Sequence, residues 1–126
     1  MNYRIAVERT FSAAHALRGY KGKCERMHGH TWKVQAVVKG KKLNHLGMLV
    51  DFHDLKAILD AIIARLDHCV INEVPPFTGI NPTAEQIAQY IFTQLRKDAA
   101  FRKTNGARLA SVKVWESETS SAEVNV

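Results

Sequence analysis

Hydrophobic and polar residues alternate along the first part of the chain. The apolar positions share one parity: Tyr3, Ile5, Val7, Phe11 and Ala13. A period of two predicts a β-strand with one buried face. The run His30–Lys39 alternates in the same way and predicts a second strand, whose apolar side holds Trp32, Val34, Ala36 and Val38. After turn residues at 44–47, Met48–Val50 is predicted to resume a short strand.

The middle of the chain has helical spacing instead of alternation. Asp51 is predicted to cap a helix whose apolar residues recur at intervals of three and four: Leu55, Ile58, Leu59, Ile62, Ile63 and Leu66. A second helix is predicted to begin at Thr83, because Thr83 and Gln86 match a capping box. The helical region is predicted to end at Asn105-Gly106, and three prolines and a glycine predict a loop over 74–82.

Two further strands are predicted near the end of the chain. Arg108–Glu116 alternates again, and a last strand is expected near Ala122–Val126. The order ββααββ predicts an α+β fold, in which an antiparallel four-stranded sheet carries both helices on one face. With no internal repeat, linker or shift in composition, residues 1–126 are expected to form a single domain.

Composition and charge narrow the classes of function. The 126 residues are 46% hydrophobic and 24% charged, which is typical of a globular domain and argues against disorder. The 18 basic and 12 acidic residues give a net charge of +6, which favours anionic partners. Because no basic stripe is interleaved with aromatic residues, we expect a small phosphorylated substrate and no nucleic acid.

Other features bear on location and redox state. No apolar run approaches the ~20 residues that a bilayer-spanning helix needs, so no membrane association is expected. The N-terminal residues lack the basic-then-apolar pattern of a signal peptide, so we expect a cytoplasmic location. In that compartment Cys24 and Cys69 are expected to be free thiols.

Three histidines are predicted to meet at one end of the sheet. His28 and His30 are two residues apart, so both project from the apolar face if the second strand reaches back to His28. His15 has the parity of Phe11 and therefore lies on the apolar face of the first strand. In a hairpin the three imidazoles would be neighbours, and three histidines with an open fourth position are the ligand set of a catalytic zinc ion. If Cys24 supplied the fourth ligand, the site would instead be closed and structural.

Two other sets of residues can carry chemistry. Asp67-His68 follows the first predicted helix, where the pair is either a reactive carboxylate and imidazole or a helix C-terminus at which the dipole favours a cationic ring. Glu116 has the parity of the apolar positions in its strand. A buried carboxylate there needs a partner, such as a ligand that donates two N–H groups, whereas a solvated strand end would need none.

These residues occur in a series of motifs that resembles the 6-pyruvoyl-tetrahydropterin synthase family, and particularly its bacterial carboxy-forming branch. The motifs, in chain order, are Phe11-Ser-Ala-Ala-His15, Cys24-x-x-x-His28-Gly-His30, Gly47-Met-Leu-Val-Asp51-Phe52, Leu66-Asp67-His68, Asn81-Pro82-Thr83-Ala84-Glu85 and Val112-Lys-Val-Trp-Glu116. Their joint order covers most of the chain. The short spacing from Cys24 to His28 is similar to that of the carboxy-forming branch. Cys69 departs from the expected pattern and is interpreted as a small buried hydrophobe.

The resemblance implies a tunnelling fold (T-fold), in which trimers close their sheets into a β-barrel and stack into a homohexamer. It also implies a role for each residue of the site. The implied roles are zinc ligation by His15, His28 and His30, proton transfer by Cys24, a relay of Asp67 and His68, and binding of the pterin ring by Glu116 with help from the region of Thr83.

The activity implied by the resemblance is that of a zinc-dependent lyase of queuosine biosynthesis. Such an enzyme converts 7,8-dihydroneopterin triphosphate to 6-carboxy-5,6,7,8-tetrahydropterin and releases acetaldehyde and triphosphate. Two alternatives stay open at this point. One is a pyruvoyl-forming enzyme that uses the same residues on the same substrate, and the other is a zinc-dependent pterin-binding module without turnover.

Overall fold

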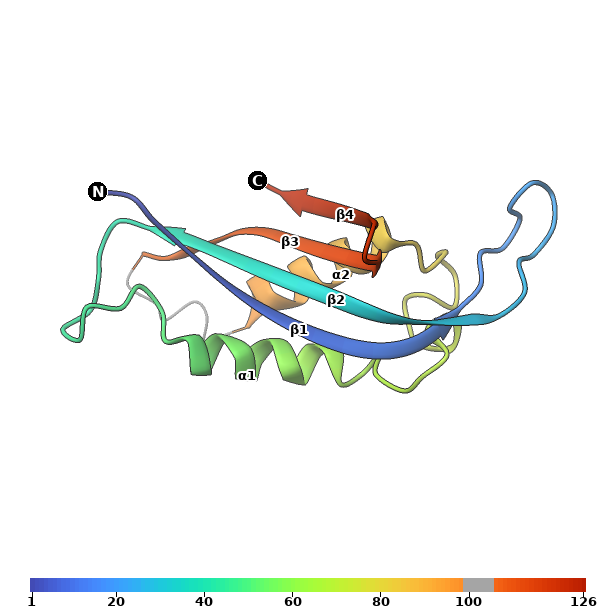
Figure 1. Ribbon diagram of the computed structural model, residues 1–126, viewed down its shortest axis with the longest axis horizontal. Coiled ribbons are helices and arrows are strands. Elements are labelled where there is room, and N and C mark those ends of the chain that lie inside the picture. The colour runs from blue at the N-terminus through green and yellow to red at the C-terminus, as the bar shows by residue number, and fades with distance from the viewer. Residues whose placement is uncertain (99–105) are drawn as a thin grey trace.

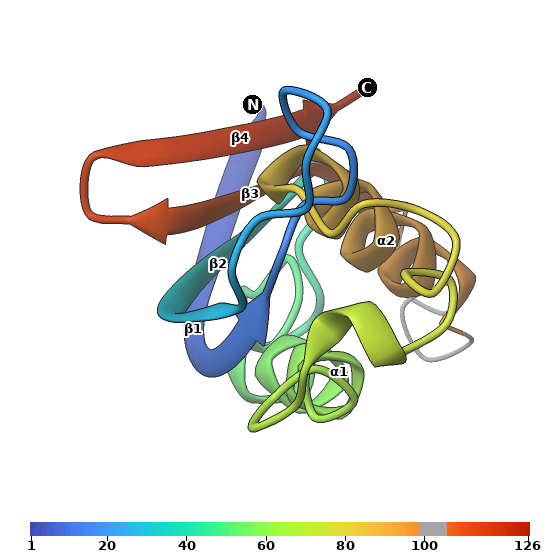
Figure 2. The same cartoon turned by 90° about the vertical axis from the view of Figure 1, so that its right-hand side faces the viewer.

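Four antiparallel strands form one sheet, and two helices cover one of its faces (Figure 1, Figure 2). The computed structural model describes residues 1–98 and 106–126. The elements follow in the order β1 (Tyr3–His15), β2 (His28–Gly40), α1 (Phe52–Ile63), the 3-10 helix η1 (Ile71–Glu73), α2 (Ala84–Lys97), β3 (Arg108–Ser117) and β4 (Ser120–Asn125). The predicted α+β class and ββααββ order are confirmed.

The strands lie across the sheet in the order β1-β2-β3-β4. β1 and β2 pair along their whole length, from Tyr3 opposite Gly40 at one end to His15 opposite His28 at the other. β2 therefore reaches back to His28, as the histidine hypothesis requires. The apolar positions of the two central strands are fully buried: Trp32, Val34, Ala36, Val38, Val112 and Val114.

Both helices begin at the predicted caps. The Asp51 side chain accepts a hydrogen bond from the backbone N–H of His53 at 2.8 Å, and Thr83 Oγ1 accepts from that of Gln86 at 3.1 Å. Each cap satisfies an N–H group that the first helical turn leaves unpaired. The buried residues of the helices are Leu55, Leu59 and Ile63 in α1, and Ile87, Ala88, Tyr90, Ile91, Phe92 and Leu95 in α2.

Some boundaries differ from the predicted ones. Met48–Val50 is not a strand, because the Asn44 side chain accepts from the N–H groups of Leu46 and Met48 and closes a turn there. α1 ends at Ile63, although Leu66 beyond it is fully buried.

The C-terminal half shows similar small differences. α2 ends at Lys97, and the predicted end of the helical region at Asn105 lies outside the described residues. β4 begins at Ser120, after a short turn from β3, and ends at Asn125. Within the part of the chain that the structure describes, no helix is long and apolar enough to cross a bilayer.

Candidate functional site

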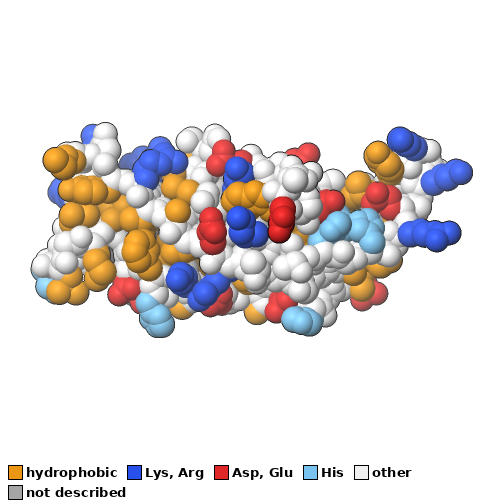
Figure 3. All heavy atoms as spheres, in the orientation of Figure 1, with side chains coloured by type: hydrophobic (Ala, Val, Ile, Leu, Met, Phe, Trp, Pro, Cys, Tyr) orange, Lys and Arg blue, Asp and Glu red, His pale blue; other side chains and the backbone are white. Residues whose placement is uncertain are grey.

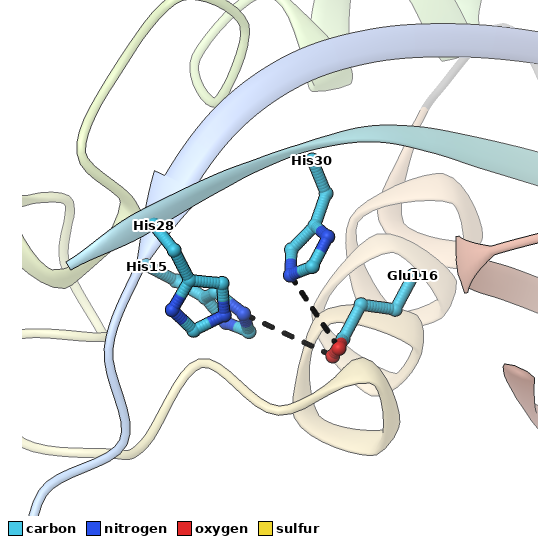
Figure 4. Close-up of side chains that lie close together, drawn as sticks. All are labelled: His15, His28, His30 and Glu116. Carbon is cyan, nitrogen blue, oxygen red and sulfur yellow. Dashed lines mark ion pairs between the residues drawn. The ribbon is translucent and has the colours of Figure 1, made fainter. Parts of the chain in front are cut away.

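The last rungs of the β1–β2 ladder bring three histidines together, as the parity of their positions predicts. Ala13 lies opposite His30, and His15 lies opposite His28. The ring centroids are 4.7 Å apart for His15 and His28, 5.2 Å for His15 and His30, and 4.8 Å for His28 and His30. Figure 4 shows the three side chains grouped with the Glu116 carboxylate at the end of the sheet.

Backbone carbonyl groups orient two of these rings. His15 Nδ1 lies 2.7 Å from the carbonyl oxygen of Pro82, and His28 Nδ1 lies 2.8 Å from that of Arg26. A carbonyl oxygen only accepts, so each Nδ1 carries the proton and donates it. In the neutral form of such a ring the lone pair is then on Nε2, which is the arrangement that metal-ligating histidines adopt in proteins.

The free Nε2 atoms supply a test of whether a metal fits. The Nε2 atoms of His15 and His30 are buried and have no hydrogen-bond partner among the described residues, and His15 is only 2% exposed. A buried acceptor without a partner is costly, roughly 1–3 kcal/mol. Burial also lowers the pKa of His30 against the opposing effect of Glu116, so that ring is neutral near pH 7 and able to bind a cation. The donor set therefore fits a divalent metal that prefers imidazole nitrogen, such as zinc.

Glu116 completes this group from β3. Its carboxylate oxygens lie 3.4 Å from His30 Nε2 and 3.8 Å from His15 Nε2 (Figure 4). One possible ligand atom from each of His15, His28, His30 and Glu116 lies within 4.8 Å of the others. Among the described residues this group does not include Cys24, so the arrangement gives no support to a closed site in which the thiol is the fourth ligand.

Cys24 lies in the loop of residues 16–27 that joins β1 to β2, and it is exposed. Two hydrogen bonds between Leu17 and Glu25 hold the two ends of the loop together. The Glu25 N–H donates to the Leu17 carbonyl oxygen at 2.9 Å, and Glu25 Oε1 accepts from the Leu17 N–H at 3.0 Å. The loop projects beyond the end of the sheet in Figure 1, and Figure 3 shows Lys and Arg side chains around it beside a group of histidines. The thiol is thus on an accessible, cation-rich loop next to the histidine group.

Arg18 has a structural task that its sequence position does not reveal. Its guanidinium donates to the carbonyl oxygens of Phe77 at 2.8 Å, Asn72 at 3.2 Å and Ile80 at 3.3 Å. The Asn81 side chain in turn bonds both backbone groups of Arg18, at 2.7 and 2.9 Å. Arg18 therefore anchors the Cys24 loop to the 72–81 segment, which leaves Lys21, Lys23 and Arg26 as the cations of the loop that can face a substrate.

Asp67 and His68 form a pair at the edge of β1. Asp67 Oδ1 accepts from the Ser12 N–H at 3.0 Å and lies 2.9 Å from His68 Nδ1. The Ser12 N–H, together with His68, holds the pKa of the Asp67 carboxyl below its usual range. α1 ends at Ile63, and the Asp67 N–H still donates to the Ile63 carbonyl oxygen at 2.9 Å, so the pair lies at the end of the helical turn as well as in contact with β1. The His68 ring is 82% exposed, at the sheet edge and outside the group of Glu116 and the three histidines.

The structure adds two positioning features that the residue pattern does not show. The Pro82 carbonyl that orients His15 immediately precedes Thr83, so the N-cap of α2 adjoins the histidine group. Trp32 packs its ring edge-to-face against His15 and His30, with centroids 4.9 and 5.3 Å away. Its Nε1–H donates to the Ala13 carbonyl oxygen at 3.3 Å. In the sequence, the contact between Pro82 and His15 was signalled by nothing more than the motif that begins at Asn81.

Nearly the whole chain is similar to known proteins. Residues 4–126 match the family model described as 6-pyruvoyl tetrahydropterin synthase. A putative 6-carboxy-5,6,7,8-tetrahydropterin synthase of Archaeoglobus fulgidus is 37% identical over 120 residues, which cover 95% of this chain and 93% of that relative. A 6-carboxy-5,6,7,8-tetrahydropterin synthase of Synechocystis is 37% identical over 124 residues, with 94% and 89% covered.

Two further similarities concern activity and fold. A dihydroneopterin monophosphate aldolase of Pyrococcus furiosus is 33% identical over 116 residues, which cover 92% of this chain and 91% of the aldolase. The structure of 6-pyruvoyl tetrahydropterin synthase from Caenorhabditis elegans superposes with a TM-score of 0.83 at 22% identity, covering 100% of this chain and 96% of that one. The likeness to that structure confirms the expected fold of the subunit.

Proposed function

The chain belongs to the 6-pyruvoyl tetrahydropterin synthase family, and on that premise we propose that it is a lyase that converts 7,8-dihydroneopterin triphosphate to 6-carboxy-5,6,7,8-tetrahydropterin. The observation that carries the proposal is the group of three histidines beside the Glu116 carboxylate. The names of two relatives at 37% identity favour the carboxy-forming reaction. A place in queuosine biosynthesis and a cytoplasmic location are parts of the same proposal.

His15, His28 and His30 would hold a zinc ion through their Nε2 atoms. In His15 and His28 the Nδ1 atom is already bonded to a backbone carbonyl oxygen. When bound, zinc polarises the side-chain oxygens of a substrate and stabilises negative charge on them. The chain's own contribution is to orient the rings of His15 and His28 through backbone carbonyl groups, and to bury His15, before any ligand arrives.

Glu116 is proposed to bind the pterin ring. An ionised carboxylate accepts two hydrogen bonds, and the amino-pyrimidine edge of a pterin offers two N–H donors side by side. Because the carboxylate lies 3.4 Å from His30 Nε2, a ring held there would bring its side chain next to the histidine group. Thr83, at the neighbouring N-cap of α2, would adjoin the same ring.

Cys24 is proposed to transfer a proton as the thiolate, which a nearby cation favours. Lys21, Lys23 and Arg26 surround it in sequence and would bind the triphosphate. His68 is proposed as the partner acid or base, oriented by Asp67 at 2.9 Å. In one chain this pair lies at the edge of β1 and not in the histidine group, so we propose that it serves the Cys24 loop of a neighbouring chain.

A ring of chains would bring these parts together. β1 and β4 are the two edges of the sheet, and each leaves backbone N–H and C=O groups without a strand partner. Pairing β1 of one chain with β4 of the next satisfies those groups without open-ended aggregation. The face without helices would then line a barrel, which accounts for its polar side chains: Thr31, Lys33, Gln35, Lys39 and Lys113. We propose trimeric rings that stack into a hexamer.

Product analysis tests the function against its alternatives. Purified protein incubated with 7,8-dihydroneopterin triphosphate should release acetaldehyde and free triphosphate. A pyruvoyl-forming enzyme would release triphosphate without acetaldehyde, and a binding module would release neither. The aldolase relative makes carbon–carbon cleavage a further candidate, in which the phosphates would stay on the two-carbon fragment. Any of these three outcomes would replace the proposed reaction.

A further inference from the structure

A concave region lies at the end of the sheet opposite the histidines. It is a cavity of about 900 Å³, bordered by the first residues of β1, the end of β2 with the residues after it, and the start of β3. Its charged lining residues are Arg4, Lys39, Lys41, Lys42 and Arg108. No Asp or Glu is among the described lining residues, so the cavity concentrates five positive charges of a chain whose net charge is +6.

Three of these cations form a row across neighbouring strands. Arg4 of β1 lies opposite Lys39 of β2, and Lys39 lies opposite Arg108 of β3. Residues directly opposite each other in an antiparallel ladder project from the same face, and like charges there destabilise the sheet. The neighbours of the row, Ile5, Val38 and Leu109, turn inward, so the three cations project from the face without helices. The row is a local electrostatic cost that a bound anion would relieve.

Within residues 1–98 and 106–126, none of the five cations of the cavity forms an ion pair with a carboxylate. Lys41 and Lys42 extend the row into the segment after β2 and are exposed. Cations that converge on a concave surface and lack carboxylate partners are the usual arrangement for binding several phosphate groups at once.

We propose that this cavity binds the polyphosphate group of a small molecule, either inorganic polyphosphate or the phosphates of a nucleotide. The volume lies within the ~300–1,000 Å³ of small-molecule sites. Tyr3 is the one aromatic residue among the described lining residues, which therefore offer no series of stacking platforms for a nucleic acid strand. The cavity is separate from the proposed catalytic site, because the cavity and the histidines lie at opposite ends of the β1–β2 ladder.

Isothermal titration with inorganic tripolyphosphate, ATP and a single-stranded oligonucleotide tests the proposal. The Lys21→Ala/Lys23→Ala background removes cations of the Cys24 loop, so that binding near the active site does not mask the cavity. In that background, Lys41→Ala/Lys42→Ala should weaken tripolyphosphate binding by at least about tenfold at low salt, since two positive charges beside the bound phosphates are lost. Both residues lie outside the strands, and Arg108→Gln provides a second, independent variant. The matched control is Lys56→Ala/Lys97→Ala on the helices.

Each outcome decides between the possibilities. Equal affinity for tripolyphosphate and ATP supports a site for phosphate alone, whereas tighter binding of ATP supports a nucleotide site in which Tyr3 contacts the base. Equal effects of the cavity and control variants would overturn the proposal, as would the absence of tripolyphosphate binding. Preferential binding of the oligonucleotide would also overturn it, in favour of a nucleic-acid surface. The catalytic proposal is judged separately, because the cavity variants with Lys21 and Lys23 intact should retain wild-type turnover.

Discussion

His15 points its Nδ1 at the carbonyl oxygen of Pro82, 2.7 Å away, and thereby ties the end of β1 to the residue before the N-cap of α2. The bond fixes the tautomer of the ring, because the carbonyl can only accept. The opposite nitrogen, Nε2, is buried without a partner among the described residues. The Pro82 carbonyl thus orients His15, the most buried histidine of the site, so that its Nε2 faces a possible ligand.

Metal content is the first prediction. The protein should bind about one zinc ion per chain, and His28→Ala should lose metal and turnover together, because three nitrogen ligands are the minimum for such a site. Metal analysis after dialysis checks this, with the exposed His53→Ala as a control that should keep its zinc. Stoichiometric zinc in a variant with His15, His28 and His30 all changed to alanine would show that the metal lies elsewhere.

Glu116→Gln should separate binding of the pterin ring from binding of the metal. If Glu116 accepts hydrogen bonds from the ring, the amide replaces one acceptor with a donor, and kcat/KM should fall by about tenfold or more. Zinc content should stay near that of the wild-type protein. Loss of zinc in proportion to activity would instead indicate that Glu116 is a metal ligand. Its carboxylate lies 3.4 Å from His30 Nε2, close enough for that role.

The two cysteines should behave differently. Cys24→Ala is expected to retain zinc and fold but to lose turnover by at least about 10²-fold, the usual contribution of a proton-transfer group. Cys69→Ala is the matched control and should be nearly silent. Its backbone carbonyl would still accept from the Ala14 N–H after the substitution. Cys69 is half-buried and not fully buried as expected, and its thiol donates to the Asp67 carbonyl oxygen at 3.3 Å. Loss of zinc from Cys24→Ala would indicate a closed structural site.

Acid should weaken the contact between Asp67 and β1. The folded-state pKa of Asp67 lies below its ordinary value, chiefly because the Ser12 N–H binds the carboxylate. The resulting stability is fully present above the unfolded pKa, ~3.9, and is lost as the pH falls through the lower folded value. The difference in free energy of unfolding between wild type and Asp67→Asn should therefore shrink below about pH 4. Urea unfolding from pH 2 to 7 measures it, with Glu123→Gln as a control. A pH-independent difference would contradict the linkage.

Complementation tests whether the site is shared between chains. Cys24→Ala and His68→Ala should each be inactive alone. If the thiol of one chain works with the imidazole of the next, co-expressed mixed rings should recover about a quarter of wild-type activity, because one site in four combines both intact residues. Light scattering should report a trimer-based assembly. A fully active monomer would refute the shared site.

The sequence was most informative where strict alternation fixed the face of each residue. His15, His28 and His30 could be grouped because parity gives the face and an antiparallel hairpin gives the end of the sheet. Glu116 has the parity of the apolar positions of its strand, and its carboxylate does lie beside His15 and His30. Alternation gives the face but not the neighbours, so it left open whether the carboxylate meets a partner or a solvated strand end.

Arg18 shows a second limit of inference from sequence. Within a basic loop it reads as a cation for a phosphate, but three backbone carbonyl groups of the 72–80 segment accept its hydrogen bonds. Carbonyl acceptors exist at every residue, so no side-chain pattern marks the ones that a distant arginine will use. The turn at Asn44 likewise replaced a predicted strand through contacts of a side chain with its own neighbouring backbone.

The place of the histidines on the final rung of the β1–β2 ladder also bears on how the chain opens. The ends of a ladder fray more readily than its centre, and residues 16–27 leave directly from the rung of His15 and His28. An ion bound by His15 and His28 would link the two strands where the Cys24 loop begins and ends, and would restrain that loop. Removal of the ion would raise amide hydrogen exchange beside His28 while the central rung of Val7 and Ala36 kept its protection, so the same ligands would govern both the chemistry and the restraint of the reactive loop.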